Sequence, residues 1–202
     1  MERSDFFSFL DLPRKLNIDM ARLDERYRTL SRQFHPDFFY NATPAERRLS
    51  LERSSYLNDA YRALRDPVRR IEYLLKIEGL APKNEQEASR QVPPALLEEV
   101  FALNEELDEV REQRASGAAA GVWRPRLERA RQPIERKRVE HEAELQSLAA
   151  RWDAVAERPV ASADRRQVLE ALRDRFLERN YINNLLAGIE REMSAECGDK
   201  VE

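Results

Sequence analysis

Apolar residues recur at helical spacing along much of the chain, and the pattern is clearest near its beginning. Between Asp19 and Phe34 the apolar side chains fall on one narrow arc at about 100° per residue: Met20, Leu23, Tyr27, Leu30 and Phe34. This spacing predicts an amphipathic helix over the stretch. We expect the helix to end at His35-Pro36-Asp37.

Shorter helices are predicted on both sides of this segment. Ser4 is the expected cap of a first helix that stops near Leu12-Pro13, because the residue before a proline avoids helical angles. That helix carries Phe6, Phe7, Phe9 and Leu10. Further along, Thr43-Pro44-Ala45-Glu46 has the form of a capping box with proline at the first helical position. It predicts a third helix from about Pro44, with an inner face made of Leu49, Tyr56, Leu57, Ala60 and Leu64.

The third helix is expected to break at Asp66-Pro67 and to be followed by a helix from about Val68 to Glu78. Gly79 is its expected stop. Residues 80–93 are polar, contain two prolines and show no periodicity, which predicts an inter-domain linker.

Three longer helices are predicted after the linker. The first runs from Pro94 to about Arg114, with a core stripe at Leu96, Val100, Leu103, Leu107 and Val110. The second carries a stripe from Trp123 to Trp152, in which Pro133 is expected to make a kink. The last follows Pro159. These elements predict an all-α chain of two domains, with an N-terminal helical domain over 1–79, a linker over 80–93 and an antiparallel three-helix bundle over 94–202.

Composition agrees with long helices and narrows the chemistry. Of the 202 residues, 36% are charged and only five are glycine, which is typical of helices with solvated outer faces. The formal net charge of −3 disfavours binding to nucleic acid or to membranes by bulk charge. The single cysteine, Cys197, excludes an intrachain disulfide, and we expect no metal site and no cofactor. Without an apolar stretch of about 20 residues or a signal peptide, a cytoplasmic location is expected.

His35-Pro36-Asp37 is the most specific short motif. A bare tripeptide of this kind is usually an ordinary inter-helix loop. Here it follows a helix whose outer face carries Arg26, Arg28 and Arg32, and it precedes a capped helix that contains Asn58-Asp59-Ala60-Tyr61.

This combination resembles a J domain, a helical hairpin with short flanking helices. The resemblance implies that the basic helix face meets an acidic surface on the ATPase of a DnaK-type chaperone, HscA or DnaK. It also implies that His35, Pro36 and Asp37 engage that chaperone and favour ATP hydrolysis by it. The chain itself would then not be an enzyme.

Other motifs are similar to the HscB branch of J proteins: Leu57-Asn58-Asp59-Ala60-Tyr61, Leu64-Arg65-Asp66-Pro67 and Arg70-Ile71-Glu72-Tyr73-Leu74-Leu75. In that branch Tyr73, Leu74 and Leu75 would be buried anchors that pack the J domain against the bundle. The resemblance further implies that the bundle delivers the iron–sulfur cluster scaffold, an IscU-type protein. The residues that would bind this scaffold are Leu97, Phe101, Glu105, Glu109 and Phe176.

Periodicity alone places Leu97 and Phe101 beside the core stripe of the first bundle helix, flanked by Glu98, Glu105, Asp108 and Glu109. An apolar patch fringed by carboxylates is typical of a protein-binding surface, although packing on a neighbouring helix would explain it equally well. Relative to better-known bacterial members of the branch, Glu98 and Ala102 differ in character. His141, on the second apolar stripe, is expected to be a packed core histidine rather than a metal ligand.

Three other functions are compatible with parts of the sequence. A general J-domain co-chaperone would deliver other client proteins and show little preference for the scaffold. An enzyme could use His35 and Asp37 as an acid–base pair, but no nucleophile, metal site or phosphate-binding glycine loop accompanies them. A nucleic-acid binder would use the arginines, yet acidic residues outnumber basic ones by 38 to 35.

Overall fold

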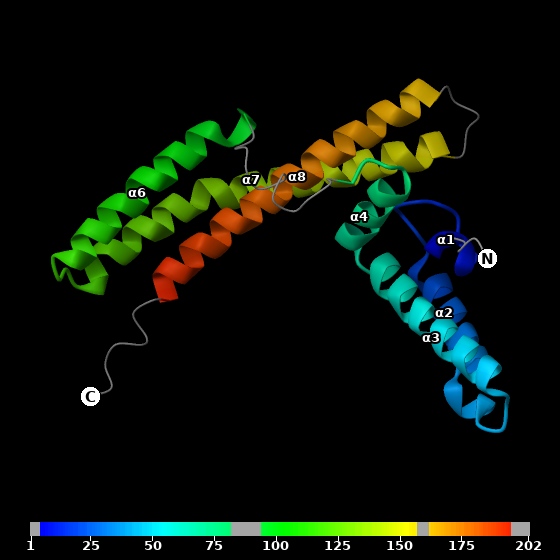
Figure 1. Cartoon of the computed structure of the whole chain (residues 1–202). Helices are drawn as coiled ribbons and strands as arrows, with labels where there is room; N and C mark the ends of the chain where they lie inside the picture. The colour runs from blue at the N-terminus through cyan, green and yellow to red at the C-terminus, as the bar shows by residue number, and fades with distance from the viewer. Residues whose placement is uncertain (1–4, 82–93, 157–161, 195–202) are drawn as a thin grey trace, which may run out of the picture. The chain divides into compact units, whose positions relative to one another are not determined.

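The computed structural model describes residues 5–81, 94–156 and 162–194, and all regular elements in these ranges are helical (Figure 1). The predicted all-α fold is confirmed. The elements, labelled as in Figure 1, are α1 (Phe6–Phe9), α2 (Met20–Phe34), the 3₁₀ turn η1 (Pro36–Phe39), α3 (Pro44–Arg65), α4 (Pro67–Ile77), the 3₁₀ turn η2 (Pro94–Leu96), α6 (Leu97–Ala115), α7 (Ala120–Ala156) and α8 (Ser162–Ser194).

Two compact units make up the chain. Of the described residues, 5–81, 147–156 and 162–173 belong to the first unit, and 94–146 and 174–194 belong to the second. Residues 147–156 and 162–173, which we expected in the bundle, therefore group with the N-terminal helices. The expected linker falls almost wholly outside the described residues, so the predicted domain boundary stays a prediction.

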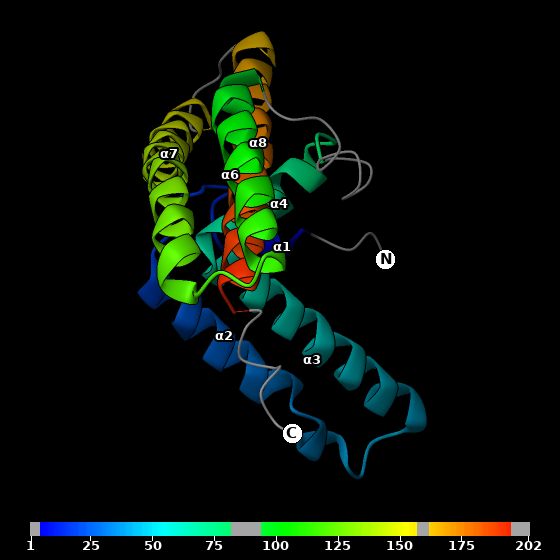
Figure 2. The ribbon, with the colours of Figure 1, turned by 90° about the vertical axis from the view of Figure 1, so that its left-hand side faces the viewer.

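An antiparallel hairpin of α2 and α3 is the central feature of the first unit (Figure 2). The rings of Tyr27 and Tyr61 stack with centroids 4.1 Å apart. Tyr27 donates its hydroxyl hydrogen to Asn58 Oδ1 at 2.9 Å, and Tyr61 donates to Asp24 Oδ1 at 2.8 Å. The hydrogen bond to Asp24 is the largest cause of a raised pKa at Tyr61. These contacts fix the register of the two helices.

The hydrophobic core of the hairpin is closed by α1. Its buried members are Phe7, Leu10, Leu12, Leu23, Leu57, Ala60 and Leu64. Leu49, predicted to face inward, is instead 42% exposed. The buried line along α3 runs through Ser50, whose hydroxyl donates to the free carbonyl oxygen of Phe34 at the end of α2. The inward position that the apolar pattern assigned to Leu49 is therefore taken by Ser50, whose hydroxyl caps the C-terminal end of α2.

The ends of α1 also differ from the prediction. Asp5 is the N-cap and accepts a hydrogen bond from the Ser8 N–H, whereas Ser4 lies outside the described residues. The helix ends at Phe9, and Asp11 takes a φ of +52°. An aspartate tolerates this left-handed conformation, which stops the helix before Pro13 is reached.

The other predicted helix boundaries, at Thr43, at Asp66-Pro67 and at Gly79, are confirmed. Thr43 and Glu46 form both halves of the capping box of α3. Asp66 caps α4 through the N–H groups of Val68 and Arg69, and Gly79 follows that helix with a φ of +73°. Glycine has no Cβ and adopts this left-handed angle without steric cost, which explains the stop.

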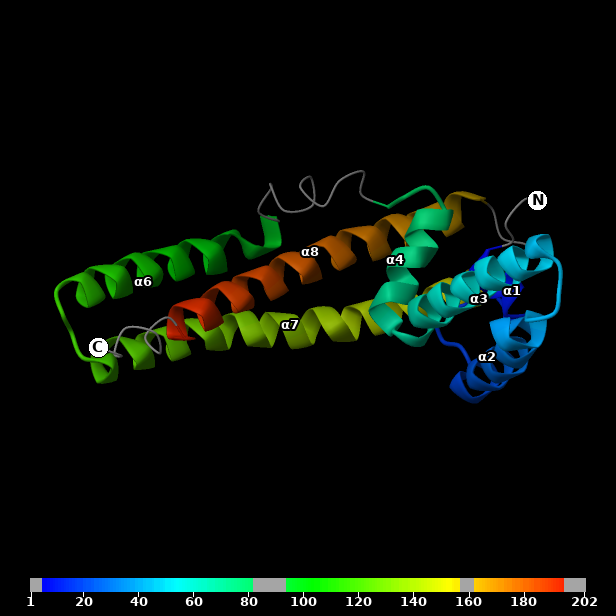
Figure 3. The same ribbon diagram turned by 60° about the horizontal axis from the view of Figure 1, so that its bottom comes forward.

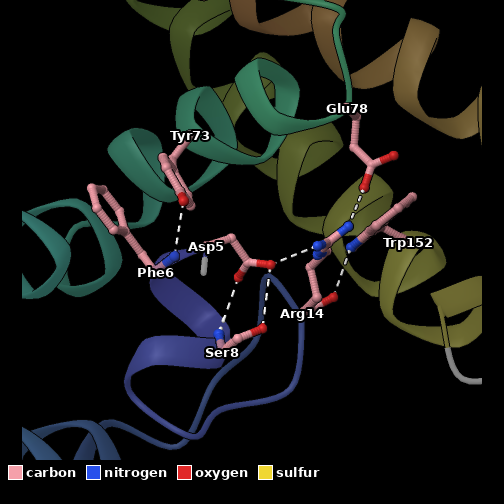
Figure 4. Close-up of polar contacts among 7 residues, drawn as sticks. All are labelled: Asp5, Phe6, Ser8, Arg14, Tyr73, Glu78 and Trp152. Atoms are coloured by element: carbon pink, nitrogen blue, oxygen red, sulfur yellow. Dashed lines mark hydrogen bonds and ion pairs between the residues drawn. The ribbon is translucent and has the colours of Figure 1, made fainter. Parts of the chain in front are cut away.

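Arg14 and Asp153 hold the N-terminal loop within the first unit. Arg14 makes ion pairs with Asp5 at 2.6 Å and Glu78 at 3.0 Å, and its carbonyl oxygen accepts a hydrogen bond from the indole N–H of Trp152 (Figure 4). The carboxylate of Asp153 accepts hydrogen bonds from the backbone N–H groups of Leu16 and Asn17. The tip of α7 thus binds the segment that leads into α2.

The anchors expected in α4 are found in two environments. Leu74 and Leu75 are fully buried. Tyr73 is only half-buried; its ring stacks on Phe6 at 4.2 Å and its hydroxyl oxygen accepts a hydrogen bond from the Phe6 N–H (Figure 4). Tyr73 therefore fastens α1 to α4.

The second unit has a core shared by α6, α7 and α8 (Figure 3). The stripe expected on the first bundle helix is confirmed. Leu96 of η2 and Val100, Leu103 and Val110 of α6 are buried, and Leu107 packs against them. The partners from the other two helices are Trp123, Leu127, Ile134, Ile182, Leu186 and Ile189. Pro133 lies inside α7, and the kink expected there stays a prediction. In the described part of the chain, no helix has an apolar stretch that could cross a membrane.

Candidate interaction sites

The loop that closes the α2–α3 hairpin presents His35, Pro36 and Asp37. His35 ends α2 in an extended conformation, and Pro36 then starts η1, where its fixed φ suits the first helical position. The side chains of His35 and Asp37 are 51% and 86% exposed. The loop therefore offers an imidazole and a carboxylate to solvent on a short, stiff turn.

A local hydrogen bond orients the imidazole. Nδ1 of His35 accepts from the backbone N–H of Asp37 at 3.3 Å, while Oδ2 of Asp37 lies 3.5 Å from the same nitrogen. Accepting this bond requires an unprotonated Nδ1, so the approach of the carboxylate is not an ion pair in that state. The bond uses Nδ1 and leaves Nε2 outside this local contact, on a side chain that is half exposed.

The three predicted arginines of α2 are not equivalent. Arg26 donates from Nε to the Leu10 carbonyl oxygen at 3.3 Å and lies 3.8 Å from the carboxylate of Asp11. Arg28 and Arg32 are exposed, and Arg32 Nε donates to the Arg28 carbonyl oxygen one turn earlier. The guanidinium of Arg26 is thus partly engaged in contacts within the chain, whereas Arg28 and Arg32 face solvent.

Leu97 and Phe101 lie one turn apart on α6 and are exposed by 40% and 70%. Glu105 continues the same line and is exposed. Glu109 is also exposed, but it makes an ion pair with Arg126 of α7, which is bound to Glu106 as well. The expected apolar patch with an acidic fringe is therefore present on α6, with two of its carboxylates already paired, Glu109 with Arg126 and Asp108 with Arg111.

Phe176 does not share that surface. Its side chain is 5% exposed, and it continues a buried line of α8 formed by Leu169 and Leu172. Spacings of three and four residues put these side chains on one helix face, and that face is covered. A buried ring offers no area to a partner in this state, so Phe176 acts as a core residue here.

A groove between α6 and α7 was not foreseen from the sequence. Its lining includes Glu98, Ala102 and Leu103 of α6 with Pro133 and Ile134 of α7. No local pattern could reveal the groove, because it needs two helices in register.

His141 is buried, as expected, at 4% exposure. Its Nδ1 lies 3.3 Å from Oε2 of Glu178, which also pairs with Arg175. Among the described residues, no group of three or more His, Cys, Asp or Glu side chains could hold a metal ion. His141 therefore belongs to a polar contact inside the helix bundle.

The chain resembles known proteins in both sequence and fold, although no family model matches it. Over 113 residues it is 41% identical to the co-chaperone protein HscB homolog of Cupriavidus taiwanensis, a match that covers 56% of this chain and 63% of that relative. The structure of chaperone HscB from Vibrio cholerae matches with a TM-score of 0.60 and 26% identity, covering 95% of this chain and 99% of that one. Human co-chaperone protein HscB matches in fold with a TM-score of 0.64 at 24% identity, covering 96% and 85% of the two chains.

These findings first define a class: an all-α protein with an N-terminal J domain and a C-terminal helical bundle. Within that class, the chain is similar in sequence to an HscB homolog over 113 residues and in fold to solved HscB structures. The matched segment spans less than two thirds of the length of the curated relative.

Proposed function

We propose that this protein is a co-chaperone that stimulates ATP hydrolysis by a DnaK-type chaperone and delivers to it an iron–sulfur cluster scaffold of the IscU type. The observation that carries the proposal is the exposed His35-Pro36-Asp37 turn at the end of the α2–α3 hairpin, in a chain homologous to HscB co-chaperones. The chain would act through its partner's catalysis and not as an enzyme.

The charges around the turn support the first half of the proposal. Arg28 and Arg32 face solvent on the helix that leads into the turn. Exposed guanidinium groups favour encounter with an acidic surface and act mainly on the association rate. We assign a smaller part to Arg26, because the Leu10 carbonyl and the Asp11 carboxylate hold it.

The α6 surface supports the second half. Phe101 and Leu97 expose apolar area beside Glu105, and exposed aromatic side chains ringed by polar groups are common at protein interfaces. We assign Leu97, Phe101, Glu105 and Glu109 to scaffold binding. Phe176 is left out of this surface because its ring is buried.

Steady-state ATP hydrolysis by the DnaK-type chaperone tests both halves. The rate is measured with this protein or with its His35→Gln variant, each with and without the scaffold. We expect stimulation that disappears in His35→Gln and that rises more than additively when scaffold is added. Because His35 is half exposed, the substitution should leave the fold intact, and circular dichroism checks this.

Two results would change the proposal. If stimulation is indifferent to scaffold, the chain is a general J-domain co-chaperone that delivers other clients. If the wild-type protein gives no stimulation, the co-chaperone function is wrong for that chaperone.

A further inference from the structure

Exposed apolar side chains are concentrated around the His-Pro-Asp turn. In the described part of the first unit, the large hydrophobic residues with high exposure are Met20, Phe38, Tyr40, Leu49 and Leu51. Four of these five lie within residues 38–51, directly after Asp37. Phe38 and Tyr40 stand out because they are aromatic and 75% and 79% exposed.

Both aromatic residues belong to the same turn as the motif. The backbone N–H of Phe38 donates to the His35 carbonyl oxygen at 3.1 Å, and that of Tyr40 donates to the Asp37 carbonyl oxygen at 3.4 Å. The rings of Phe38 and His35 meet edge to face, with centroids 6.1 Å apart. A surface that contacts the imidazole of His35 therefore also reaches the ring of Phe38.

The residue between them serves a different purpose. Phe39 is half-buried, whereas its two neighbours face solvent. A single exposed hydrophobic side chain is ordinary in a folded protein. Two exposed aromatic rings that flank one half-buried ring, on a turn already assigned to docking, are less readily explained by packing.

We propose that Phe38 and Tyr40 form an aromatic contact surface that binds the same DnaK-type ATPase as His35 and Asp37. This inference rests on the proposed function and deepens it. The occupant follows from continuity, because the rings lie on the turn that the chaperone must touch. The surface they meet is apolar and lies beside the acidic groups that receive Arg28 and Arg32. Aromatic side chains at the centre of an interface commonly supply a large share of the binding energy.

The test is the concentration dependence of ATPase stimulation by the full chain. The variant Phe38→Ser/Tyr40→Ser is compared with wild type and with Val122→Ser/Val139→Ser, which removes two exposed apolar side chains from α7. We expect the half-maximal concentration to rise about tenfold or more in the aromatic variant, with a maximal rate within about twofold of wild type. The α7 control should match wild type. Phe38→Tyr/Tyr40→Phe keeps both rings and should restore normal behaviour.

The outcomes separate this inference from the proposed function. If His35→Gln abolishes stimulation but Phe38→Ser/Tyr40→Ser leaves the half-maximal concentration unchanged, the aromatic contact is wrong and the co-chaperone function stands. If wild type does not stimulate at all, both are wrong. If sedimentation shows that wild type is a dimer and the aromatic variant a monomer with normal stimulation, the surface joins two copies of this chain and the inference is overturned.

Discussion

The carboxylate of Asp153 accepts three hydrogen bonds from residues more than 130 positions away in the sequence. Oδ1 receives the Leu16 N–H at 2.6 Å, and Oδ2 receives the Asn17 N–H at 2.9 Å and the Asn17 side-chain amide at 2.8 Å. Leu16 is buried, so its N–H has little access to water as a substitute partner. The carboxylate of Asp153 in α7 thus provides the hydrogen-bond acceptors for the loop that leads into α2.

Replacing Asp153 by alanine should therefore destabilise the protein by about 2–3 kcal/mol, since hydrogen bonds to a charged group are lost and a buried N–H is left unpaired. Asp153→Asn keeps one oxygen acceptor and should lose about half as much. Urea unfolding followed by circular dichroism measures both values. Arg151→Ala, at an exposed position nearby, is the control and should change stability by less than about 0.5 kcal/mol. An Asp153→Ala variant as stable as that control would contradict this account.

A second residue-scale prediction concerns pH. Partial burial raises the pKa of Asp5, but hydrogen bonds from the Ser8 N–H and the Arg14 guanidinium outweigh it and hold the pKa below its ordinary value of 3.8. A lowered pKa in the folded state gives stability that is fully present above about pH 5 and is lost as pH falls through the folded pKa.

Asp5→Asn should then be less stable than wild type at pH 7, by under about 1 kcal/mol because the ion pair with Arg14 is partly solvated. The gap should close as the pH falls below about 4. Thermal unfolding of both proteins from pH 7 to pH 3 gives the comparison. A gap that stays constant over this range would show that the Asp5 carboxylate does not contribute through its ionisation.

Among the helices, α3 has the N-terminus that the sequence predicts most clearly. The Thr43 hydroxyl oxygen accepts the Glu46 N–H at 3.3 Å, and the Glu46 carboxylate accepts the Thr43 N–H at 2.9 Å. The hydrogen bond from the Thr43 hydroxyl is the largest cause of a lowered pKa at Glu46.

Thr43→Ala should lower the free energy of unfolding, measured with urea, by about 1 kcal/mol, which is the usual loss when an N-cap is removed. Ser55→Ala, on an exposed face of the same helix, serves as control, and equal stability of the two variants would mean that the cap adds nothing.

How far the elements could be predicted depends on whether their signals are local. The capping box at Thr43, the break at Asp66-Pro67 and the stop at Gly79 each involve residues within one turn, and all three are confirmed. Leu49 was assigned inward because apolar spacing cannot show that Ser50 is needed to bind the Phe34 carbonyl. Phe176 was assigned outward by resemblance, although its own spacing from Leu169 and Leu172 marks a buried line.

The candidate sites divide in the same way. Local patterns predicted the residues that lie at the surface. The turn between two helices predicted His35 and Asp37, and the apolar face beside the core stripe of α6 predicted Leu97 and Phe101. The hydrogen bonds of Asp153 and the ion pair between Arg26 and Asp11 could not be predicted. Each contact joins two segments that come together only when the chain folds.

On the scale of the whole molecule, the two proposed interaction surfaces belong to different units. His35 lies in the first unit, and Leu97 and Phe101 lie in the second. Each surface consists of exposed side chains, so changing it removes little packing. Activation of the chaperone and capture of the scaffold should therefore be separable by mutation.

Leu97→Ser/Phe101→Ser tests this separation. We expect the variant to keep its melting temperature within a few degrees and to retain stimulation of the chaperone's ATPase in the absence of scaffold. Affinity for the scaffold, measured by calorimetry, should fall at least about tenfold, because two exposed apolar anchors are lost. The extra stimulation by scaffold should fall with it. His35→Gln should show the reverse pattern, with normal scaffold affinity and no stimulation, and Val139→Ser on α7 should match wild type in both assays. A loss of basal stimulation in the α6 variant at normal stability would show that the two surfaces act as one site.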